Sequence, residues 1–555
     1  MKVSGAQLIL QCLKEQGVDT IFGYPGGAVI PLYDALYDEK EIRHIITAHE
    51  QGATHAADGY ARSTGKVGVV IATSGPGATN TVTGIATAYS DSIPMVVITG
   101  QVARSLLGRD SFQEVDITSI TSSITKKNYQ VKSIEELPQV ISEAFYLAKE
   151  GRPGPVLIDI PKDIQQAFIE YEVEEKKQYD FSHLDNKGTI DIKQIEAAAK
   201  LINESKKPMI YAGGGIIIAG ASNELLELAE KIKSPVTTSL MGTGGFPNNH
   251  PLFTGMVGMH GCHSSNYGIT KCDLLITLGA RFSDRVASHI ETFAPHAKVI
   301  HVDIDEKEIG KNVRVDAPII GDLKKVLPKL IELVEEKSLS EWNNQIDQWK
   351  EQYPLKDKHN GLSPKFILSK LYDLTQGDII ITTEVGQNQV WAAQYYTYTK
   401  PRSFISSGGL GTMGYGLGAA IGASIGNPGK KVVNVAGDGS FKMNCNELAT
   451  LSKYKPQVIQ LVFNNHALGM VRQWQELFCN SRFSFTLFED DVDFIKLGAA
   501  YGIKAIRIKS NDEVEAALKE ALETEEPVIL ECIINEENMV LPMVAPGAPI
   551  DEILD

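Results

Sequence analysis

Short, continuous apolar runs rich in β-branched residues recur along the chain and alternate with segments of helical spacing. Clear examples are the runs at 67–73, 94–100, 155–161, 274–279, 298–304, 432–437 and 458–464. A strand that is apolar on both faces must be covered on both faces, and helices that connect such strands provide that cover in a parallel sheet. The sequence therefore predicts an α/β fold built from doubly wound parallel sheets.

Two polar, charged stretches interrupt this pattern, at 174–188 and 341–361. Such stretches are typical of connections between domains. The chain of 555 residues is long enough for about three domains of ordinary size. We therefore expect three α/β domains, at 1–175, 188–340 and 361–545.

The composition limits the classes of partner. A formal net charge of −16 argues against a nucleic-acid partner, because a phosphate backbone requires clustered Lys and Arg. The six cysteines are scattered without a CxxC pair, which favours free thiols in a reducing cytoplasm over disulfides or metal ligation. The N-terminus lacks an uninterrupted signal-peptide core, and no apolar run approaches a membrane span. We expect a cytoplasmic protein that binds no membrane.

The stretch 432–465 combines a strand, a Gly-Asp-Gly turn, a helix predicted over 441–454 and a second strand. In a right-handed βαβ unit, Asp438 and Asn465 then lie at the carboxyl ends of parallel strands, where open α/β sheets bind ligands. Their carboxylate and amide oxygens suit Mg²⁺ or Ca²⁺, and the cation can bridge a diphosphate near the helix N-terminus. A helix N-cap and a turn would explain each residue alone, but the pair at this spacing favours a metal site.

This GDG…NN spacing resembles the signature of thiamine-diphosphate enzymes. The resemblance implies that Asp438, Asn465 and the main-chain carbonyl of Ala467 hold Mg²⁺. It also implies contacts to thiamine diphosphate from Gln387, Asn388, Gly437, Gly439 and Ser440.

A second part of the cofactor site is predicted around Glu50, which follows a short strand and precedes a helix. Thiamine chemistry needs an acid that hydrogen-bonds N1′ of the aminopyrimidine and promotes its imino tautomer. A glutamate in this position should be largely desolvated, which suits proton transfer near neutrality. An ordinary first-turn helix acid is the alternative. The HE, GA and GYAR motifs within 42–65 resemble the family's pyrimidine-binding domain and favour the catalytic role.

Two Gly-rich segments resemble the same domain. They are GYPGGA (23–28), with Gly26 at the cofactor and Gly27 at the substrate, and ATSGPGATN (72–80), with Asn80 at the cofactor. In this enzyme class the pyrimidine domain of one subunit faces the diphosphate domain of another. The resemblance therefore implies a homodimer or a dimer of dimers.

Over essentially the whole chain, the resemblance narrows to the catalytic subunits of acetohydroxyacid synthases (acetolactate synthases). The segments that carry it are 23–28, 98–102, 110–117, 382–396, 404–416, 468–478 and 541–547. It implies decarboxylation of pyruvate and transfer of the two-carbon unit to a second 2-ketoacid, giving 2-acetolactate or 2-aceto-2-hydroxybutyrate for branched-chain amino acids. Feedback control would need a separate small regulatory subunit.

Other enzymes that use thiamine diphosphate or a nucleotide cofactor are alternatives to this family. A catabolic acetolactate synthase without flavin, a pyruvate oxidase and a simple 2-ketoacid decarboxylase are the nearest alternatives. A Rossmann-type dehydrogenase would need GxGxxG at the start of a helix, and GGGIIIAGA (213–221) fits that motif poorly.

The resemblance also assigns residues to the substrates. Met413 resembles the bulky residue that bends the cofactor, although an apolar Met is often a core filler. Trp474 lies four residues past Met470, so both share one face if this stretch is helical. Lys126 could attract a 2-ketoacid carboxylate, with a solvated surface lysine as the alternative. The implied channel residues are Phe112, Gln113 and Lys126, and the implied acceptor-pocket residues are Met470, Val471 and Trp474.

The middle of the chain resembles the family's FAD domain at 258–268, 279–285 and 301–312. Acetolactate formation involves no net redox chemistry, so the FAD would be structural. The implied FAD contacts are Arg152, Gly213, Gly214, His260, Gly261, Arg281, Phe282, Asp303 and Asp322.

Four positions depart from the residues common in the family. Ser283 replaces the first Asp of RFDDR, which weakens the expectation of flavin. Ser122 replaces Arg and Lys127 replaces His, both near the predicted channel. Gly418 replaces Pro and is expected to loosen the start of a helix.

Overall fold

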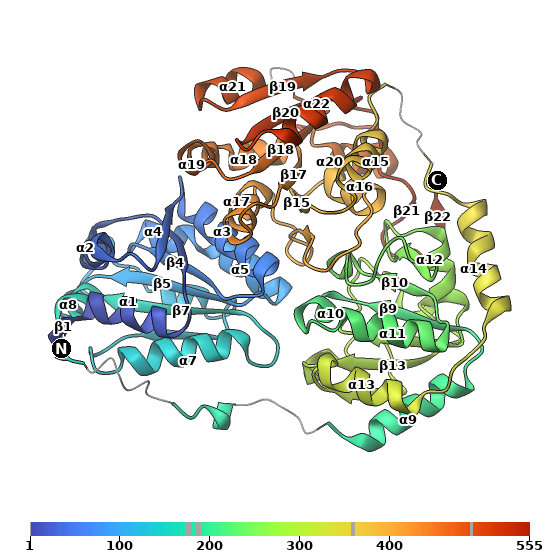
Figure 1. The fold of residues 1–555 in the computed structure, drawn as a ribbon, viewed down its shortest axis with the longest axis horizontal. Coiled ribbons are helices and arrows are strands. Elements are labelled where there is room, and N and C mark those ends of the chain that lie inside the picture. The colour runs from blue at the N-terminus through green and yellow to red at the C-terminus, as the bar shows by residue number, and fades with distance from the viewer. Residues whose placement is uncertain (1, 172–178, 185–189, 357–360, 489–491) are drawn as a thin grey trace.

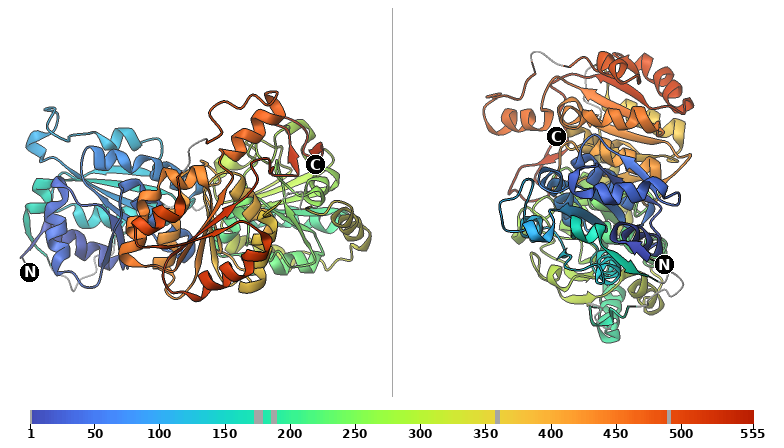
Figure 2. Two further views of the ribbon diagram at one scale, coloured as in Figure 1. Left: turned by 90° about the horizontal axis from the view of Figure 1, so that it is seen from above. Right: turned by 90° about the vertical axis from the view of Figure 1, so that its left-hand side faces the viewer.

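The computed structural model describes residues 2–171, 179–184, 190–356, 361–488 and 492–555. Within these ranges the chain forms three six-stranded parallel sheets, each in its own α/β unit (Figures 1 and 2). This confirms the predicted fold class. The predicted boundaries at 175 and 188, and much of the predicted linker 174–188, lie outside the described residues.

The N-terminal unit has the strand order β3-β2-β4-β5-β7-β6. Alternate residues of β4 face opposite cores: Val69 and Ile71 pack in the core of α1 and α7, and Val70 packs in the core of α3 and α5. The strands are β2 (Thr20–Gly23), β3 (Arg43–Ile46), β4 (Gly68–Ala72), β5 (Met95–Gln101), β6 (Lys127–Gln130) and β7 (Pro155–Pro161). The helices are α1 (Gly5–Glu15), α2 (Ile30–Asp38), α3 (Glu50–Thr64), α4 (Pro76–Asn80), α5 (Val82–Asp91), α6 (Ile117–Thr121), α7 (Leu137–Lys149) and α8 (Lys162–Gln166).

The middle unit has the strand order β11-β10-β9-β12-β13-β14. Helices α9, α11 and α13 share one core with the sheet, and α12 and α14 pack in a second core. The strands are β9 (Pro208–Ala212), β10 (Val236–Thr238), β11 (Phe253–Met256), β12 (Leu274–Leu278), β13 (Lys298–Asp303) and β14 (Ala317–Ile320). The helices are α9 (Ile192–Glu204), α10 (Gly214–Ile218), α11 (Ser222–Ile232), α12 (His263–Lys271), α13 (Leu323–Leu333) and α14 (Ser340–Gln352).

The second predicted linker, 341–361, contains most of helix α14 and is therefore not simply an extended connection. Trp342 and Ile346 lie four residues apart and are both buried in the core of the middle unit. The Trp342 indole donates to the Pro208 carbonyl at 3.0 Å. A few well-spaced apolar residues thus hold an otherwise polar segment as a helix, because one apolar stripe is enough to pack against a core.

The C-terminal unit has the strand order β16-β15-β17-β18-β20-β19. The strands are β15 (Ile380–Thr383), β16 (Phe404–Ile405), β17 (Val432–Gly437), β18 (Val458–Asn464), β19 (Lys504–Ile508) and β20 (Val528–Ile533). The helices are α15 (Pro364–Thr375), α16 (Gln387–Tyr395), α17 (Gly416–Gly426), α18 (Asp438–Met443), α19 (Leu448–Tyr454), α20 (Gly469–Phe478), α21 (Phe494–Ala500) and α22 (Asn511–Glu523). A short final pair, β21 (Met543–Val544) and β22 (Ile553–Leu554), is antiparallel.

The single helix predicted over 441–454 is wrong. The chain forms α18, a 3-10 turn and then α19, with the break at Asn444, whose φ is −134°. The Asn444 side chain donates to the Gly414 carbonyl at 2.7 Å. A tertiary hydrogen bond therefore fixes a bend that the helical spacing of the sequence does not reveal.

In each sheet the chain crosses from one side of the sheet's first strand to the other, between β2 and β4, between β9 and β12, and between β15 and β17, and this crossing reverses the direction of growth. The N-terminal and C-terminal sheets also double back at their far edge, at β7 and β20. Open α/β sheets bind ligands outside the carboxyl ends of the strands at such a reversal. No helix in the described ranges has the length and hydropathy needed to span a membrane.

The N-terminal and C-terminal units are joined by the packing of α3 on α17 (Figure 1). Glycines allow the two backbones to approach closely. A Cβ on Gly59 would lie 2.1 Å from the Ala419 carbonyl oxygen, and one on Gly422 would lie 1.7 Å from the Ala56 carbonyl oxygen. Any larger residue at Gly59 or Gly422 would force the helices apart.

A buried ionic network fastens the same interface. The Arg62 guanidinium donates to Asp58 at 2.5 Å, to Asp91 at 2.9 Å and to the Ser406 carbonyl at 2.9 Å. The Tyr415 hydroxyl donates to Asp58. Arg62 is therefore the cation that compensates two buried carboxylates at the interface.

Replacing Arg62 by Met should lower the free energy of unfolding by about 3–5 kcal/mol, because it leaves two buried carboxylates without their cation. Urea unfolding measures this change. Arg104 is the control, because its ion pair with Asp163 is largely exposed, and Arg104→Met should cost less than about 1 kcal/mol. Equal effects of the two substitutions would contradict the assignment.

Candidate active site

A cavity opens at the reversal point of the C-terminal sheet. Its walls come from within 385–391, 437–440 and 463–471, with Met413 and Ile534. It brings together most of the site residues predicted for this part of the chain: Gln387, Asn388, Met413, Gly437, Asp438, Gly439, Ser440, Asn465, Ala467, Met470 and Val471.

The predicted metal ligands lie at adjacent strand ends. Asp438 follows β17 and Asn465 follows β18, and both are almost fully buried. Asn465 Oδ1 accepts the Ala467 amide at 3.3 Å across a turn in which His466 has a φ of +53°. A carboxylate, an amide oxygen and a main-chain carbonyl form an all-oxygen donor set, which fits Mg²⁺. Among the described residues, no group of three His, Cys, Asp or Glu side chains could hold a metal elsewhere.

The two amide side chains at the start of α16 are held by hydrogen bonds. Gln387 Nε2 donates to Gln473 Oε1 at 3.0 Å and to the Asn538 carbonyl at 2.8 Å. Asn388 Nδ2 donates to the carbonyls of Glu384 and Val435 at 2.9 and 2.8 Å. These contacts fix both side chains in the cavity wall, beside a helix N-terminus that favours an anion.

Glu384 is a site residue that the sequence reasoning missed. It follows β15, is fully buried, and accepts the amides of Gly414 at 2.8 Å and Leu417 at 3.2 Å. Gly414 directly follows Met413, and Leu417 lies in the first turn of α17, so Glu384 holds the chain between Met413 and this helix. Burial raises the pKa of Glu384 to about 7 although the N–H donors favour its charged form. The sequence signal was present, because Glu384 ends an apolar strand within the TTEVG motif.

The first residues of helix α20, Gly469, Met470 and Val471, also line the cavity. Trp474 lies one turn beyond Met470, as predicted, and its ring packs edge-on to Phe478 at 5.7 Å. The guanidinium of Arg285, from the middle unit, lies over the Trp474 ring at 5.8 Å. Val471 is about half exposed, at 49%. Trp474 and Arg285 are not among the residues that line the cavity, so the middle unit contacts α20 beyond the cavity wall.

Glu50 is placed in the N-terminal unit as predicted, at the first position of α3. It is 8% exposed, and Asn80 Nδ2 donates to its Oε2 at 3.0 Å. A Cβ on Gly77 would lie 3.1 Å from Glu50 Oε1, so the Gly-rich loop passes directly beside the carboxyl. Gly26 packs against Thr73, and Gly27 faces open space. Glu50 is therefore buried and oriented.

The predicted channel residues are spread along the edge of the N-terminal unit. Phe112 is 87% exposed, and Gln113 has a φ of +60° and packs against Gly75. The Lys126 side chain is exposed as a whole, but its ammonium group donates to the Glu150 carbonyl at 2.5 Å. Desolvation of that group lowers the pKa of Lys126 to about 8.

None of these N-terminal residues lines the cavity of the C-terminal unit, whose described wall contains no residue before Val385. The two halves of the predicted site are therefore separate within one chain.

Several of the predicted FAD residues lie at the carboxyl ends of strands in the middle sheet. Gly213 and Gly214 follow β9, Arg281 follows β12, Asp303 ends β13 and Asp322 follows β14. Because parallel strands end at one edge, this arrangement fits a dinucleotide laid across the sheet. Burial raises the pKa of Asp303 to about 6.

Some of these residues have local partners that explain them without a ligand. Asp322 caps α13 through the Lys324 amide, and Phe282 is buried in an aromatic cluster with Tyr211 and Phe293. Arg152 pairs with Asp305 at 3.3 Å and with Glu308 at 3.2 Å. Arg281 donates to the Ser90 carbonyl at 2.9 Å. Gly261 packs against Asn266, and burial lowers the pKa of neighbouring His260 to about 4.

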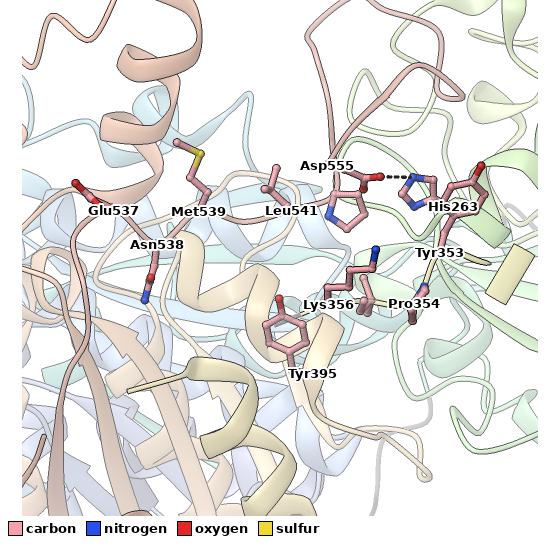
Figure 3. Close-up of a pocket in the computed structure, with 12 residues that line it drawn as sticks. His263, Tyr353, Pro354, Lys356, Tyr395, Glu537, Asn538, Met539, Leu541 and Asp555 are labelled. Atoms are coloured by element: carbon pink, nitrogen blue, oxygen red, sulfur yellow. Dashed lines mark ion pairs between the residues drawn. The ribbon is translucent and has the colours of Figure 1, made fainter. Parts of the chain in front are cut away.

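A larger cavity, of about 310 Å³, lies behind the acceptor wall (Figure 3). His263 stacks on Tyr353 with ring centroids 4.5 Å apart and pairs with Asp555 at 3.4 Å. The Asn538 carbonyl accepts the Gln387 side chain, and Asn538 also lines this cavity. One chain segment thus separates the two cavities.

The positions that depart from the family's common residues have clear surroundings. Lys127 pairs with Glu143 at 2.5 Å, and Ser122 and Ser283 are exposed. Gly418 was expected to loosen a helix start, and the structure adds a different role. A Cβ on Gly418 would lie 2.8 Å from His55 Cβ, so this glycine permits close packing of α17 on α3.

Three family models match the chain. The thiamine pyrophosphate enzyme N-terminal TPP binding domain matches residues 3–120, the central domain matches 195–330, and the C-terminal TPP binding domain matches 384–532. Each matched range lies within one of the three α/β units.

Curated relatives match over the full length. The probable acetolactate synthase large subunit of Methanocaldococcus jannaschii is 49% identical over 100% of this chain and 95% of its own. The acetolactate synthase isozyme 2 large subunit of Escherichia coli is 45% identical over 100% of both chains. The acetolactate synthase large subunit of Lactococcus lactis is 45% identical over 99% of this chain and 96% of its own.

Replacing Glu384 by Gln should remove one source of pH-dependent stability. An unfolded glutamate has a pKa of about 4.3, whereas that of Glu384 is raised to about 7. Between these values the folded chain retains a proton that the unfolded chain has released, so the free energy of unfolding falls as the pH rises through this window. The loss should reach about 3 kcal/mol.

Urea unfolding at about pH 5 and about pH 7.5 measures this difference. The decrease between the two pH values should be smaller in Glu384→Gln than in the unchanged protein. The control is Asp284→Asn, because the Asp284 side chain is 80% exposed. An unchanged pH dependence in Glu384→Gln would show that Glu384 is ionised throughout this range.

Proposed function

The chain belongs to the acetolactate synthase large-subunit family of thiamine pyrophosphate enzymes, and from this we propose that it decarboxylates pyruvate and joins the two-carbon unit to a second 2-ketoacid. The products are 2-acetolactate from pyruvate and 2-aceto-2-hydroxybutyrate from 2-ketobutyrate, which serve branched-chain amino acid biosynthesis. The observation that carries the proposal is the cavity in which Asp438, Asn465 and the acceptor helix α20 meet.

Asp438, Asn465 and the Ala467 carbonyl would hold Mg²⁺, which joins the diphosphate of the cofactor to the C-terminal unit. Gln387 and Asn388 would contact the same diphosphate from the start of α16. When bound, thiamine diphosphate supplies a nucleophilic C2 carbon and an electron sink for decarboxylation. Met413, which lines the same cavity and precedes the Gly414 amide held by Glu384, would contact the cofactor.

Glu50 would move the proton that activates the cofactor. Asn80 donates to Oε2 and so fixes the plane of the carboxyl group, with Oε1 beside the Gly77 loop. Burial at 8% exposure keeps competing water away from the carboxyl.

A homodimer, or a dimer of dimers, would bring the two halves of the site together. The support is that no described N-terminal residue lines the cavity of its own C-terminal unit. Gly26 would then contact the cofactor in the partner's cavity, and Gly27, Phe112, Gln113 and Lys126 would border its substrate channel.

FAD is proposed as a structural cofactor of the middle unit, along the edge where Gly213, Arg281 and Asp303 lie. A small regulatory subunit is proposed because the relatives are named large subunits.

The experiment that tests the function supplies purified protein with thiamine diphosphate, Mg²⁺ and FAD. Pyruvate and 2-ketobutyrate are given in equal amounts, and acetaldehyde and both acetohydroxyacids are quantified. We expect mainly 2-aceto-2-hydroxybutyrate. Acetolactate as the sole product would indicate a catabolic synthase, and mainly acetaldehyde would indicate a decarboxylase.

Replacing Glu50 by Gln should lower kcat by about 10²–10⁴-fold, because the amide cannot transfer the proton. Steady-state rates measure this loss. Titration with thiamine diphosphate and Mg²⁺ should show nearly unchanged binding, because Glu50 does not line the diphosphate cavity. Full activity of Glu50→Gln would refute the role.

Replacing Trp474 by Leu should reduce the preference for 2-ketobutyrate over pyruvate as acceptor. One methylene in an apolar pocket is worth about 1–3 kcal/mol, or about 10–200-fold. Competition between the two acceptors measures the product ratio. Leu477→Ala on the exposed side of α20 is the control and should keep the ratio. An unchanged product ratio in Trp474→Leu would show that Trp474 contributes packing and does not select the acceptor.

A further inference from the structure

The turn that carries Glu50 is held by side chains from the C-terminal unit. The Ala48 and His49 amides donate to Glu447 Oε2 and Oε1, each at 3.1 Å. The Ile46 amide, two residues before Ala48, donates to the Tyr454 hydroxyl at 2.9 Å. The peptide groups immediately before Glu50 are thus positioned across a domain interface.

Glu447 is built into this position. Its side chain is 0% exposed, and the Thr450 hydroxyl donates to its Oε2 at 2.6 Å. The α3 backbone approaches so closely that a Cβ on Gly52 would lie 1.9 Å from Glu447 Oε1. Burial raises the pKa of Glu447, although the hydrogen bonds from Thr450, Ala48 and His49 favour its charged form. This buried carboxyl is not among the groups proposed to contact the metal, the cofactor or the substrates.

We propose that Glu447 is a positioning residue that sets the orientation of Glu50 for proton transfer. Each carboxylate oxygen accepts one peptide N–H, so the Ala48–His49 peptides cannot rotate, and the start of α3 at Glu50 is fixed with them. This inference rests on the proposed function, because it gives Glu447 a role only if Glu50 activates the cofactor.

The contact also joins two parts of the catalytic machinery. Glu447 ends the short segment that begins with Asp438, the proposed metal ligand. Because Glu50 does not line the cavity of its own chain, Glu447 in the proposed dimer connects the metal turn of one site to the proton-transfer glutamate of the other.

Replacing Glu447 by Gln tests whether both amide contacts are needed. A carboxylate presents two acceptors to the two N–H groups, whereas an amide must turn its NH₂ toward one of them. Glu447→Gln therefore keeps the volume and breaks one contact.

The test measures exchange of the C2 proton of bound thiamine diphosphate for deuterium, by acid quench and NMR. This exchange reports cofactor activation in the absence of 2-ketoacid. We expect Glu447→Gln to slow it at least about tenfold, with nearly unchanged affinity for thiamine diphosphate and Mg²⁺. Glu230→Gln is the control, because Glu230 lies on α11 of the middle unit with its side chain 54% exposed, and its exchange rate should stay unchanged.

A second variant, Gly52→Ala, tests the same contact if Glu447→Gln does not fold. Gly52→Ala leaves Glu447 in place but drives a methyl group against its carboxylate, so it should slow exchange in the same way. Circular dichroism and the thermal midpoint identify a variant that has not folded.

The outcomes separate the two proposals. Normal exchange in folded Glu447→Gln and Gly52→Ala, with slow exchange in Glu50→Gln, overturns the positioning role and leaves the proposed function intact. Normal exchange in Glu50→Gln overturns the role of Glu50 and the inference with it. A loss of cofactor affinity that accounts for the slower exchange overturns the inference in favour of a purely structural role.

Discussion

The close packing of α3 against α17 is the constraint on which the rest of the molecule depends. Backbone meets backbone at Gly59 and Gly422, so the interface has almost no tolerance for a shift. Both helices start near residues of the proposed site: α3 begins with Glu50, and α17 follows the loop of Met413. The same contact that joins two domains therefore fixes the starting points of two site elements.

Buried carboxylates are used at this interface as acceptors for backbone amides. Glu384 holds the loop before α17, and Glu447 holds the turn before α3. Burial desolvates both carboxyl groups and raises their pKa values. The hydrogen bonds of each carboxyl group fix the conformation of the loop that it contacts. Asp58 differs, because Arg62 supplies a cation beside it.

The repeated sheet architecture explains where the sites lie. The N-terminal and C-terminal sheets have equivalent strand orders, and all three sheets reverse direction between two central strands. In each unit, glycines and polar side chains follow the strands at that reversal. Glu50, several of the residues proposed for FAD and the Asp438 turn thus all lie beyond the carboxyl ends of parallel strands.

The sequence by itself determined the fold class and the residues at strand ends, because apolar strands and Gly-rich turns are local patterns. It correctly placed Asp438 after β17, Asn465 after β18 and Glu50 at the start of α3. It failed at Asn444, where a helix breaks, and it did not predict that Trp342 anchors a helix within the predicted linker 341–361. Only the tertiary structure decided that Glu384 and Glu447 hold the loops of Met413 and Glu50, because their partners lie far away in the sequence. Such contacts depend on how whole domains pack, and no local pattern records them.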